Sequence, residues 1–176
     1  MARKQIRILH HGGAAGVTGS CHQLFWADGH SILIDCGLFQ GDEEQESPEI
    51  TFPLSSVKAL VLTHVHIDHC GRIPYLMAAG FTGPIYCSEP SALLLPEMLA
   101  DAFSLGISRS KQLLEEFLGK LKRMLYPIPY RQWQTISPEG SNQLRIRLHE
   151  AGHILGSAFV ECAVLSERGI FSGDLG

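Results

Sequence analysis

The chain contains 176 residues, which is enough for one ordinary domain but not comfortably for two. Apolar residues make up 45% and charged residues only 18%, so the sequence can build a core and is not typical of intrinsic disorder. The net charge of −4 excludes the broad basic surface of many nucleic-acid-binding domains, so any phosphate chemistry would depend on a local site.

The sequence predicts a cytoplasmic protein without membrane contact. The uncharged stretch from Ile73 to Ser88 is too short to cross a bilayer and is interrupted by prolines and glycines. Arg3 and Lys4 are followed by a mixed segment, not by the apolar run of a signal peptide. The five cysteines are scattered, odd in number and without a Cys-x-x-Cys pair, as is typical of reduced thiols.

The first third of the chain is expected to form strands. A turn at Asp28-Gly29 joins the second strand to the third, and Gly41–Pro48 is an acidic polar loop. The fourth strand is almost continuously apolar, which indicates burial on both faces. The expected strands are Gln5–Leu9, Gln23–Trp26, Ser31–Asp35 and Val57–Leu62.

Helices are expected in the middle of the chain. A short helix near Arg72–Ala79 ends at Gly80, and the strand Pro84–Cys87 follows it. Ser88 is placed to cap a helix that runs to about Phe103, with a proline in its first turn. A second helix begins at about Ser110, and its apolar face consists of Leu113, Leu114, Phe117, Leu118 and Leu121.

Three further strands are expected after the connector Pro127–Pro138, at Gln143–His149, Phe159–Leu165 and Gly169–Ser172. The mixture of strands and helices predicts an α/β fold with sheet and helix layers around one core.

The strongest functional motif is Thr63-His64-Val65-His66-Ile67-Asp68-His69, which directly follows the fourth expected strand. Side chains alternate in an extended segment, so His64, His66 and Asp68 are expected on one side, with His69 turning in from the next helix. Imidazole nitrogens and carboxylate oxygens bind zinc at about 2.0–2.2 Å. Manganese or iron accepts the same ligands, so the spacing does not choose the metal. Surface histidines near a turn are the plain alternative, which the density of the cluster disfavours.

Two later residues can complete the set of ligands. His153 lies in a glycine-bracketed loop and Asp174 in a Gly-Asp turn, and each of these alone is more often structural. Asp35, at a strand end, is expected either to orient a ligand histidine or to be an ordinary capped carboxylate. The predicted sites are a three-imidazole site of His64, His66 and His153, and a second site of Asp68, His69 and Asp174, with Asp174 suited to bridging both.

These motifs, in this order, resemble those of the metallo-β-lactamase superfamily. More narrowly, the chain is similar to the β-CASP RNA-processing nucleases in four segments, namely Gly13–Ser20, Asp35–Gly41, His153–Ala158 and Ser172–Gly176. The resemblance implies an αββα sandwich that holds two divalent metal ions, in the first place zinc, with manganese or iron as alternatives.

Members of that branch continue past the fourth motif into an inserted β-CASP domain and then complete the hydrolase domain. Residues 1–176 are therefore expected to be the N-terminal part of a metallo-β-lactamase domain, truncated before the β-CASP domain, the C-terminal strands and helix, and the last metal-binding histidine. The second metal site is then expected to be incomplete, and uncovered apolar surface could favour a homo-oligomer.

The implied reaction is metal-assisted hydrolysis of a phosphodiester, with RNA as the substrate of the complete protein. Two ions about 3.5–4 Å apart would lower the pKa of water to about 7 and stabilise charge on the attacking and leaving oxygens. The catalytic residues implied are Asp68, as ligand and proton acceptor, and Asp35; no substrate-binding residue is assigned.

Two alternative functions stay open, and both use the same ligands. One is a thioester, lactone or lactam hydrolase, and the other is a non-catalytic metal-binding remnant that is inactive alone. Of the remaining histidines, His22 is as compatible with a place near the site as with one away from it. The others, expected to be ordinary surface or loop residues, are His10, His11, His30 and His149.

Overall fold

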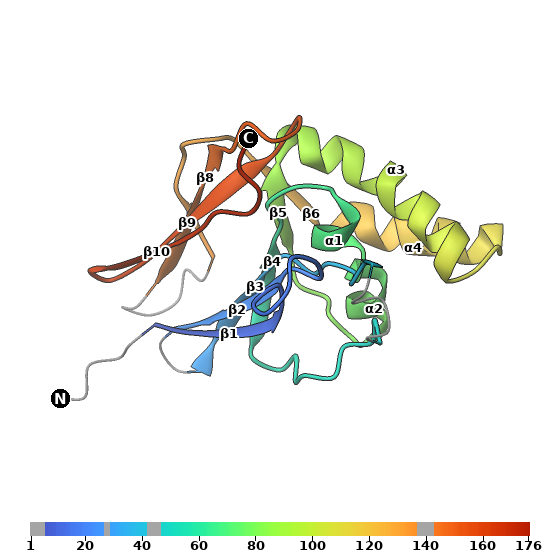
Figure 1. Cartoon of the computed structure of the whole chain (residues 1–176), viewed down its shortest axis with the longest axis horizontal. Helices are drawn as coiled ribbons and strands as arrows, with labels where there is room; N and C mark the ends of the chain where they lie inside the picture. Colours follow the sequence, from blue (N-terminus) through green and yellow to red (C-terminus); the bar gives the residue numbers. More distant parts are fainter. Residues whose placement is uncertain (1–5, 27–28, 42–46, 137–142) are drawn as a thin grey trace.

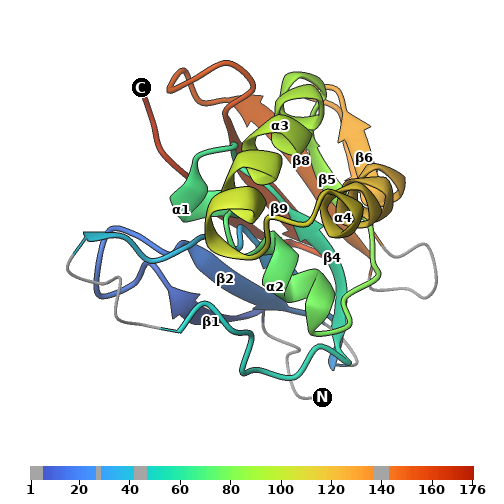
Figure 2. The same ribbon diagram turned by 90° about the vertical axis from the view of Figure 1, so that its right-hand side faces the viewer.

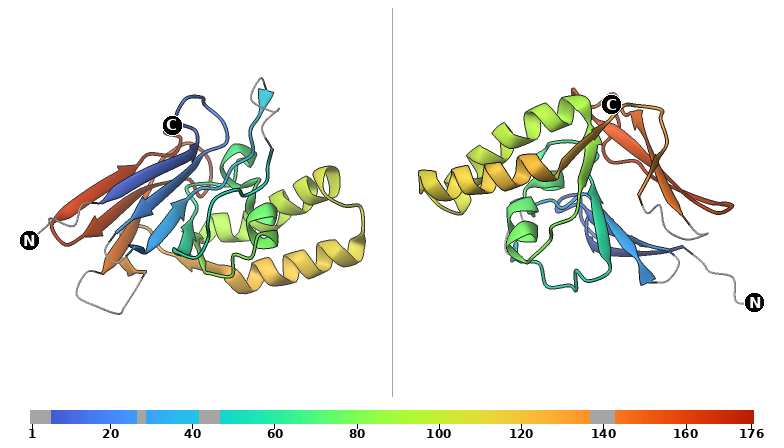
Figure 3. Two further views of the ribbon diagram at one scale, coloured as in Figure 1. Left: turned by 90° about the horizontal axis from the view of Figure 1, so that it is seen from below. Right: turned by 180° about the vertical axis from the view of Figure 1, so that it is seen from behind.

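Two stacked β-sheets and one layer of helices make up the computed structural model, which describes residues 6–26, 29–41, 47–136 and 143–176 (Figure 1). Sheet A has the strand order β1-β2-β3-β4-β5-β6, and sheet B has the order β10-β9-β8-β7. The helices lie on the side of sheet A that faces away from sheet B, as both views in Figure 3 show. The predicted α/β class is confirmed.

Sheet A is mixed. Its strands β1, β2 and β3 are antiparallel, whereas β3, β4, β5 and β6 are parallel to one another. Parallel strands have their carboxyl ends along one edge of the sheet, and this edge is where ligands bind in open α/β sheets. The strands are β1 Arg7–Gly12, β2 Cys21–Phe25, β3 Ser31–Ile34, β4 Val57–Val61, β5 Ile85–Ser88 and β6 Leu125–Ile128.

Sheet B is antiparallel throughout. Its strands are β7 Gln134–Thr135, β8 Leu144–Glu150, β9 Ala158–Val164 and β10 Glu167–Phe171. Successive side chains of β8 and β9 point to opposite faces of sheet B. One set packs in the core between the two sheets, and the other set faces away from sheet A.

Four helices are formed by the described residues: α1 Ile67–Cys70, α2 Ile73–Ala78, α3 Glu89–Gly106 and α4 Lys111–Met124. Helices α3 and α4 lie over the β5–β6 side of sheet A in the view of Figure 2, and α3 contacts both of these strands. The predicted cap is present: the Oγ atom of Ser88 accepts a hydrogen bond from Ser91 N at 3.2 Å. Ser110, where the second helix was expected to begin, caps α4 in the same way, since its Oγ atom accepts from Leu113 N at 3.4 Å. No helix among the described residues has both the length and the apolar character needed to span a membrane.

Two apolar cores fix the position of β4 between the layers. Leu60 and Leu62 pack toward the helices, whereas Ala59 and Val61 pack toward sheet B. All four side chains are completely buried. The strand is therefore buried on both faces, as its apolar sequence predicts, and it delivers the segment that follows it to a fixed place.

Several expected boundaries differ from the structure, and two of the differences are informative. The first strand extends to Gly12, three residues beyond the predicted end at Leu9. The connector predicted at Pro127–Pro138 overlaps the end of β6 and contains β7. Pro127 is tolerated in β6 because this strand pairs only with β5, at the edge of sheet A, where a proline needs to donate no ladder hydrogen bond. Gln5, Asp28, Pro138 and most of the predicted loop Gly41–Pro48 lie outside the described residues.

Candidate metal centre

The carboxyl ends of two parallel strands bring the first candidate residues together. Strand β3 ends at Ile34 and is followed by Asp35, and β4 leads through Leu62 and Thr63 into His64. The start of β9 reaches the same edge, since Ala158 N donates to Thr63 O at 2.8 Å. Segments far apart in sequence therefore meet at one edge of sheet A.

The loop that carries His153 is fixed by hydrogen bonds at both of its ends. Ser157 Oγ accepts from His153 N and from Ile154 N, each at 3.1 Å. Gly156 O accepts from Ser88 Oγ at 2.6 Å and from Ser91 Oγ at 3.0 Å. The N-terminus of α3 thus anchors this loop from a place 65 or more residues earlier in the chain.

Gly156 has a positive φ of 86° and no room for a side chain. A Cβ atom at this position would lie 2.7 Å from Ser91 Oγ and 2.9 Å from Ser91 N. The close approach of the loop to α3 therefore requires glycine.

Asp174 is positioned in a similar way by glycines. Gly173 has a φ of 53° and packs on Thr63, whose Cβ would be 2.9 Å from an added Cβ. Gly176 N donates to Ala151 O at 3.1 Å, so the segment after β10 lies against the loop that carries His153.

Three imidazole nitrogens and one carboxylate converge at this edge. His66 Nδ1 lies 3.1 Å from His64 Nε2 and 3.2 Å from His153 Nε2. Asp174 Oδ2 lies 3.5 Å from His153 Nε2 and 3.8 Å from His64 Nε2. All four ligand atoms lie within 4.8 Å of one another.

This spacing fits a bound metal ion. Two nitrogens bound tetrahedrally to zinc at 2.0–2.1 Å are separated by about 3.3 Å, which is close to the two distances between His66 Nδ1 and its neighbours. Three imidazole nitrogens and one carboxylate oxygen also make four ligands, which is the usual coordination number of zinc in proteins. The residues present therefore fit a divalent ion.

Asp68 and His69 lie on the other side of Asp174. His69 Nε2 lies 3.4 Å from Asp174 Oδ1 and 3.8 Å from Asp68 Oδ2. The two oxygens of Asp174 thus face different groups, Oδ1 toward His69 and Oδ2 toward His64 and His153. This is the geometry that a bridging carboxylate requires.

Asp35 holds His69 in place. Its Oδ2 atom lies 2.7 Å from His69 Nδ1 and also accepts hydrogen bonds from Thr63 Oγ1 at 2.8 Å and Ser20 Oγ at 3.1 Å, while Oδ1 accepts from Thr63 N at 2.8 Å. Asp35 is 1% exposed and has a φ of 60°, an unfavourable conformation that these bonds maintain. A proton on Nδ1 of His69 is shared with Asp35, which leaves Nε2 free to face Asp68 and Asp174.

Burial and neighbouring charges separate the pKa values of two adjacent histidines. Burial and the nearby His69 lower the pKa of His64 to about 4, so its imidazole is neutral near pH 7 and its Nε2 lone pair is available. Burial also acts to lower the pKa of His69, but the hydrogen bond and charge of Asp35 outweigh it, so that this pKa is raised.

One detail of the predicted arrangement is wrong. His64, His66 and Asp68 were expected to share one side of an extended segment, but helix α1 begins at Ile67, so Asp68 lies in a helical turn. Cys70 N donates to His66 O at 3.0 Å, which closes this turn. Asp68 reaches the site from the helix and not by strand alternation.

A cavity of about 510 Å³ opens beside the cluster and is lined in part by two histidines outside the predicted set of ligands. His22, on β2, lines this cavity together with Asp35, His69 and Asp174. His10, expected to be an ordinary surface residue, is exposed on β1 but lines the same cavity, and its Nδ1 lies 2.8 Å from Nδ1 of His22. Only the register of β1 against β2, which pairs these two residues, could have indicated this.

Known proteins with similar sequences are consistent with this geometry. Residues 23–176 match the Metallo-beta-lactamase superfamily. The chain is 37% identical to Ribonuclease TTHA0252 of Thermus thermophilus over 174 residues, which are 97% of this chain and 38% of that protein. It is 33% identical to Transcription termination factor FttA of Methanosarcina mazei over 159 residues, 87% of this chain and 24% of that factor.

Integrator complex subunit 11 of Danio rerio is 27% identical over 184 residues, which are 96% of this chain and 29% of that subunit. The chain thus spans between 24% and 38% of the length of these three relatives. They confirm the resemblance to the β-CASP RNA-processing nucleases. The fold and the His/Asp cluster together indicate binding of a divalent metal. The match over residues 23–176 shows that the chain belongs to the metallo-β-lactamase superfamily.

Proposed function

We propose that this chain carries the metal-binding machinery of a metal-dependent phosphodiester hydrolase that acts on RNA. The observation that carries the proposal is the convergence of His64 Nε2, His66 Nδ1 and His153 Nε2, with separations of 3.1 and 3.2 Å about His66. The relatives support the choice of substrate, because one of them is named a ribonuclease and aligns over 97% of this chain.

The proposed cofactor is a pair of divalent ions, in the first place zinc. His64, His66 and His153 would hold one ion, and Asp68 and His69 the other, with Asp174 shared between them. Two divalent ions would lower the pKa of water to about 7 and stabilise charge on the attacking and leaving oxygens of the phosphodiester. They would also supply the positive charge that a chain of net charge −4 otherwise lacks for a polyanionic substrate.

The residues of the chain have distinct tasks in this reaction. The carboxylate of Asp68 is 20% exposed and would accept the proton of the attacking water, in addition to its role as ligand. Asp35 is buried and acts through His69, which it orients by the 2.7 Å contact to Nδ1. The cavity beside the cluster is large enough for part of an RNA strand.

The two sites are expected to differ in affinity. The first has three imidazoles within the described residues, whereas the second has one imidazole and two carboxylates. We therefore expect the first ion to bind more firmly. Titration with zinc, followed by metal analysis after gel filtration, should give one tightly held equivalent and one weaker equivalent, and two equivalents of equal affinity would contradict this assignment.

A reducing, cytoplasmic setting is part of the proposal. All five cysteines are free and buried, so the fold depends on no disulfide. The expectation that the chain self-associates stays a prediction.

The direct test is hydrolysis by the metal-loaded chain. A single-stranded RNA and a bis-nitrophenyl phosphodiester are incubated with zinc-loaded or manganese-loaded protein, and a chelator is added as a control. Chelator-sensitive cleavage of either phosphodiester supports the proposal. Cleavage of a thioester, lactone or lactam but of neither phosphodiester would favour the alternative hydrolase, and no cleavage by protein with confirmed metal content would favour a non-catalytic metal-binding chain.

A further inference from the structure

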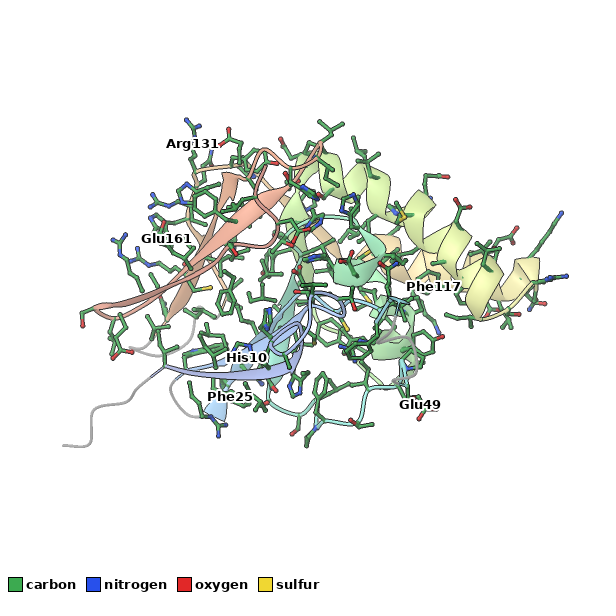
Figure 4. All side chains as sticks on the ribbon, in the orientation of Figure 1. His10, Phe25, Glu49, Phe117, Arg131 and Glu161 are labelled. Carbon is green, nitrogen blue, oxygen red and sulfur yellow. The ribbon has the colours of Figure 1, made fainter. Side chains whose placement is uncertain are left out.

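Arginines gather on the face of sheet B that points away from sheet A. Arg145 and Arg147 alternate with the buried core positions of β8, and Arg168 on β10 lies on the same face because it pairs with Ala163, which also pairs with Arg145. Figure 4 shows Glu161 among nitrogen-bearing side chains on this side of the molecule. We call Trp133, Arg145, Arg147, Glu161 and Arg168 the arginine face.

An indole is at the centre of the arginine face. The guanidinium carbons of Arg147, Arg145 and Arg168 lie 4.4, 5.0 and 5.8 Å from the ring centroid of Trp133. Cation–π attraction holds the guanidinium groups close to the ring. The half-buried ring is therefore surrounded by planar cations, and guanidinium and indole planes are the groups on which unpaired bases stack.

The arginine face carries more positive than negative charge. Glu161 Oε2 accepts from Arg147 Nη2 at 2.6 Å, and its Oε1 accepts from Arg168 Nη1 at 2.6 Å. One carboxylate thus serves two guanidinium groups, while Arg145 contacts no carboxylate among the described residues. Arg131, at the edge of this face, is already paired with Glu150 at 3.1 Å and changes the balance little.

Exposure leaves these cations accessible. The side chain of Arg168 is 64% exposed and that of Arg147 is 26% exposed, whereas Glu161 lies beneath them at 10%. A local excess of cations on an acidic chain is complementary to a polyanion. The arginine face also presents the Trp133 ring, on which a base can stack, and this distinguishes it from a basic patch that would attract any negative charge.

We propose that the arginine face binds single-stranded nucleic acid, with the guanidinium groups of Arg145 and Arg168 contacting phosphates and a base stacking at Trp133. The choice of nucleic acid as the polyanion rests on the proposed function. The site is separate from the metal centre, because its residues lie on the outer side of sheet B and none of them lines the cavity beside the cluster. It serves as a second contact that holds the strand on the protein.

The test is binding of a fluorescently labelled 12-nucleotide RNA in the presence of a chelator, so that the metal centre contributes nothing. Arg145→Gln combined with Arg168→Gln should weaken binding at least about tenfold and reduce the slope of log affinity against log salt by about 1.4, since each contact to a single strand contributes about 0.7. Trp133→Leu should weaken binding about fivefold or more, because stacking contributes about 1–3 kcal/mol per base. Arg147 is left unchanged because, of the two arginines that bond Glu161, it is the less exposed, at 26% against 64% for Arg168.

Matched controls decide the outcome. Arg109→Gln combined with Arg123→Gln removes two exposed arginines on the helical side of the molecule and should change the affinity less than twofold. Circular dichroism and zinc content confirm that each variant is folded. The proposal is overturned if both arginine pairs weaken binding equally, if the chelator abolishes binding, or if polyglutamate competes as well as RNA does. Because binding is measured without metal, a failure to hydrolyse RNA leaves this result unaffected.

Discussion

The two halves of the candidate metal centre are built in different ways. His64 and His69 follow a strand buried on both faces and are themselves 0% and 4% exposed, and Asp35 fixes His69. The side chains of His153 and Asp174, by contrast, are 28% and 43% exposed and lie on loops that depend on glycine contacts. The position of the first half is therefore fixed by packing in the core. The position of the second half is fixed by glycines that let the loop backbone lie close to neighbouring segments.

This difference indicates where the site can be broken. A change in the buried half removes or misdirects a ligand whose surroundings stay in place. A change in the loop half moves the backbone itself, so that loss of stability and loss of metal binding occur together. The predictions below test this distinction in order of decreasing effect.

The largest effect is expected for His66→Ala. It removes the imidazole whose Nδ1 lies 3.1 Å from His64 Nε2 and 3.2 Å from His153 Nε2. Zinc affinity at the first site should therefore fall more than about 100-fold. Changes to groups that only support a ligand typically lower metal affinity by about 10–100-fold. Competition with a chromophoric chelator measures this. His30→Ala, outside the cluster, is the control, and unchanged affinity and stoichiometry in the His66 variant would refute the assignment.

Asp35→Asn should weaken the second metal ion about 10–100-fold and the first one much less. The amide cannot accept the three hydrogen bonds of Oδ2 together with that of Thr63 N as a carboxylate does, so His69 loses its orientation. Stepwise zinc titration by calorimetry measures the two affinities separately. Asp101→Asn, on the exposed face of α3, should leave both affinities unchanged; an equal loss at both sites would contradict the separation of roles.

Gly156→Ala tests the loop half. The new Cβ would lie 2.7 Å from Ser91 Oγ, and the positive φ adds strain, so the free energy of unfolding should fall by about 1–3 kcal/mol and zinc affinity should fall with it. Denaturant unfolding with and without zinc measures both effects. Gly80→Ala is the control, because Gly80 also has a positive φ but has nothing within 4 Å of an added Cβ. If both variants lose the same stability, the contact with α3 is unimportant.

The smallest effect concerns pH and lies outside the metal centre. Hydrogen bonds from Arg147, His149 and Arg168 lower the pKa of Glu161 from 4.5 to about 2. A lowered pKa means that the ionised group contributes stability above pH 4.5, and that this contribution is lost as the pH falls toward 2. Glu161→Gln should therefore be less stable at pH 7 and lose less stability across this window, as measured by denaturant unfolding. A curve parallel to that of the unchanged protein would contradict this, and Glu97→Gln serves as an exposed control.

Much of the buried half could be predicted from sequence. The apolar strand that ends at Val61, the polar cluster after it and the cap at Ser88 are local patterns, and local patterns are visible in one sequence. The second role of Ser88, as a hydrogen-bond donor to the loop that carries His153, could not be predicted from the sequence. Its hydroxyl both caps α3 and donates to Gly156 O, a contact that depends on the folding of distant segments.

Other features were missed for the same reason. The turn at Ile67 closes before the alternation expected of His64, His66 and Asp68 can continue, because the backbone of His66 accepts a helical hydrogen bond. The place of His10 beside His22 follows from strand pairing, which no local pattern specifies. Long-range contacts therefore account for most of what the sequence could not indicate.

Anomalous diffraction at the zinc edge, from crystals of the zinc-loaded chain, tests the central claim most directly. We expect a peak within about 2.0–2.2 Å of His64 Nε2, His66 Nδ1 and His153 Nε2, with Asp174 on the side toward His69. A zinc peak located elsewhere, with His153 turned away from the other two imidazoles, would contradict the account.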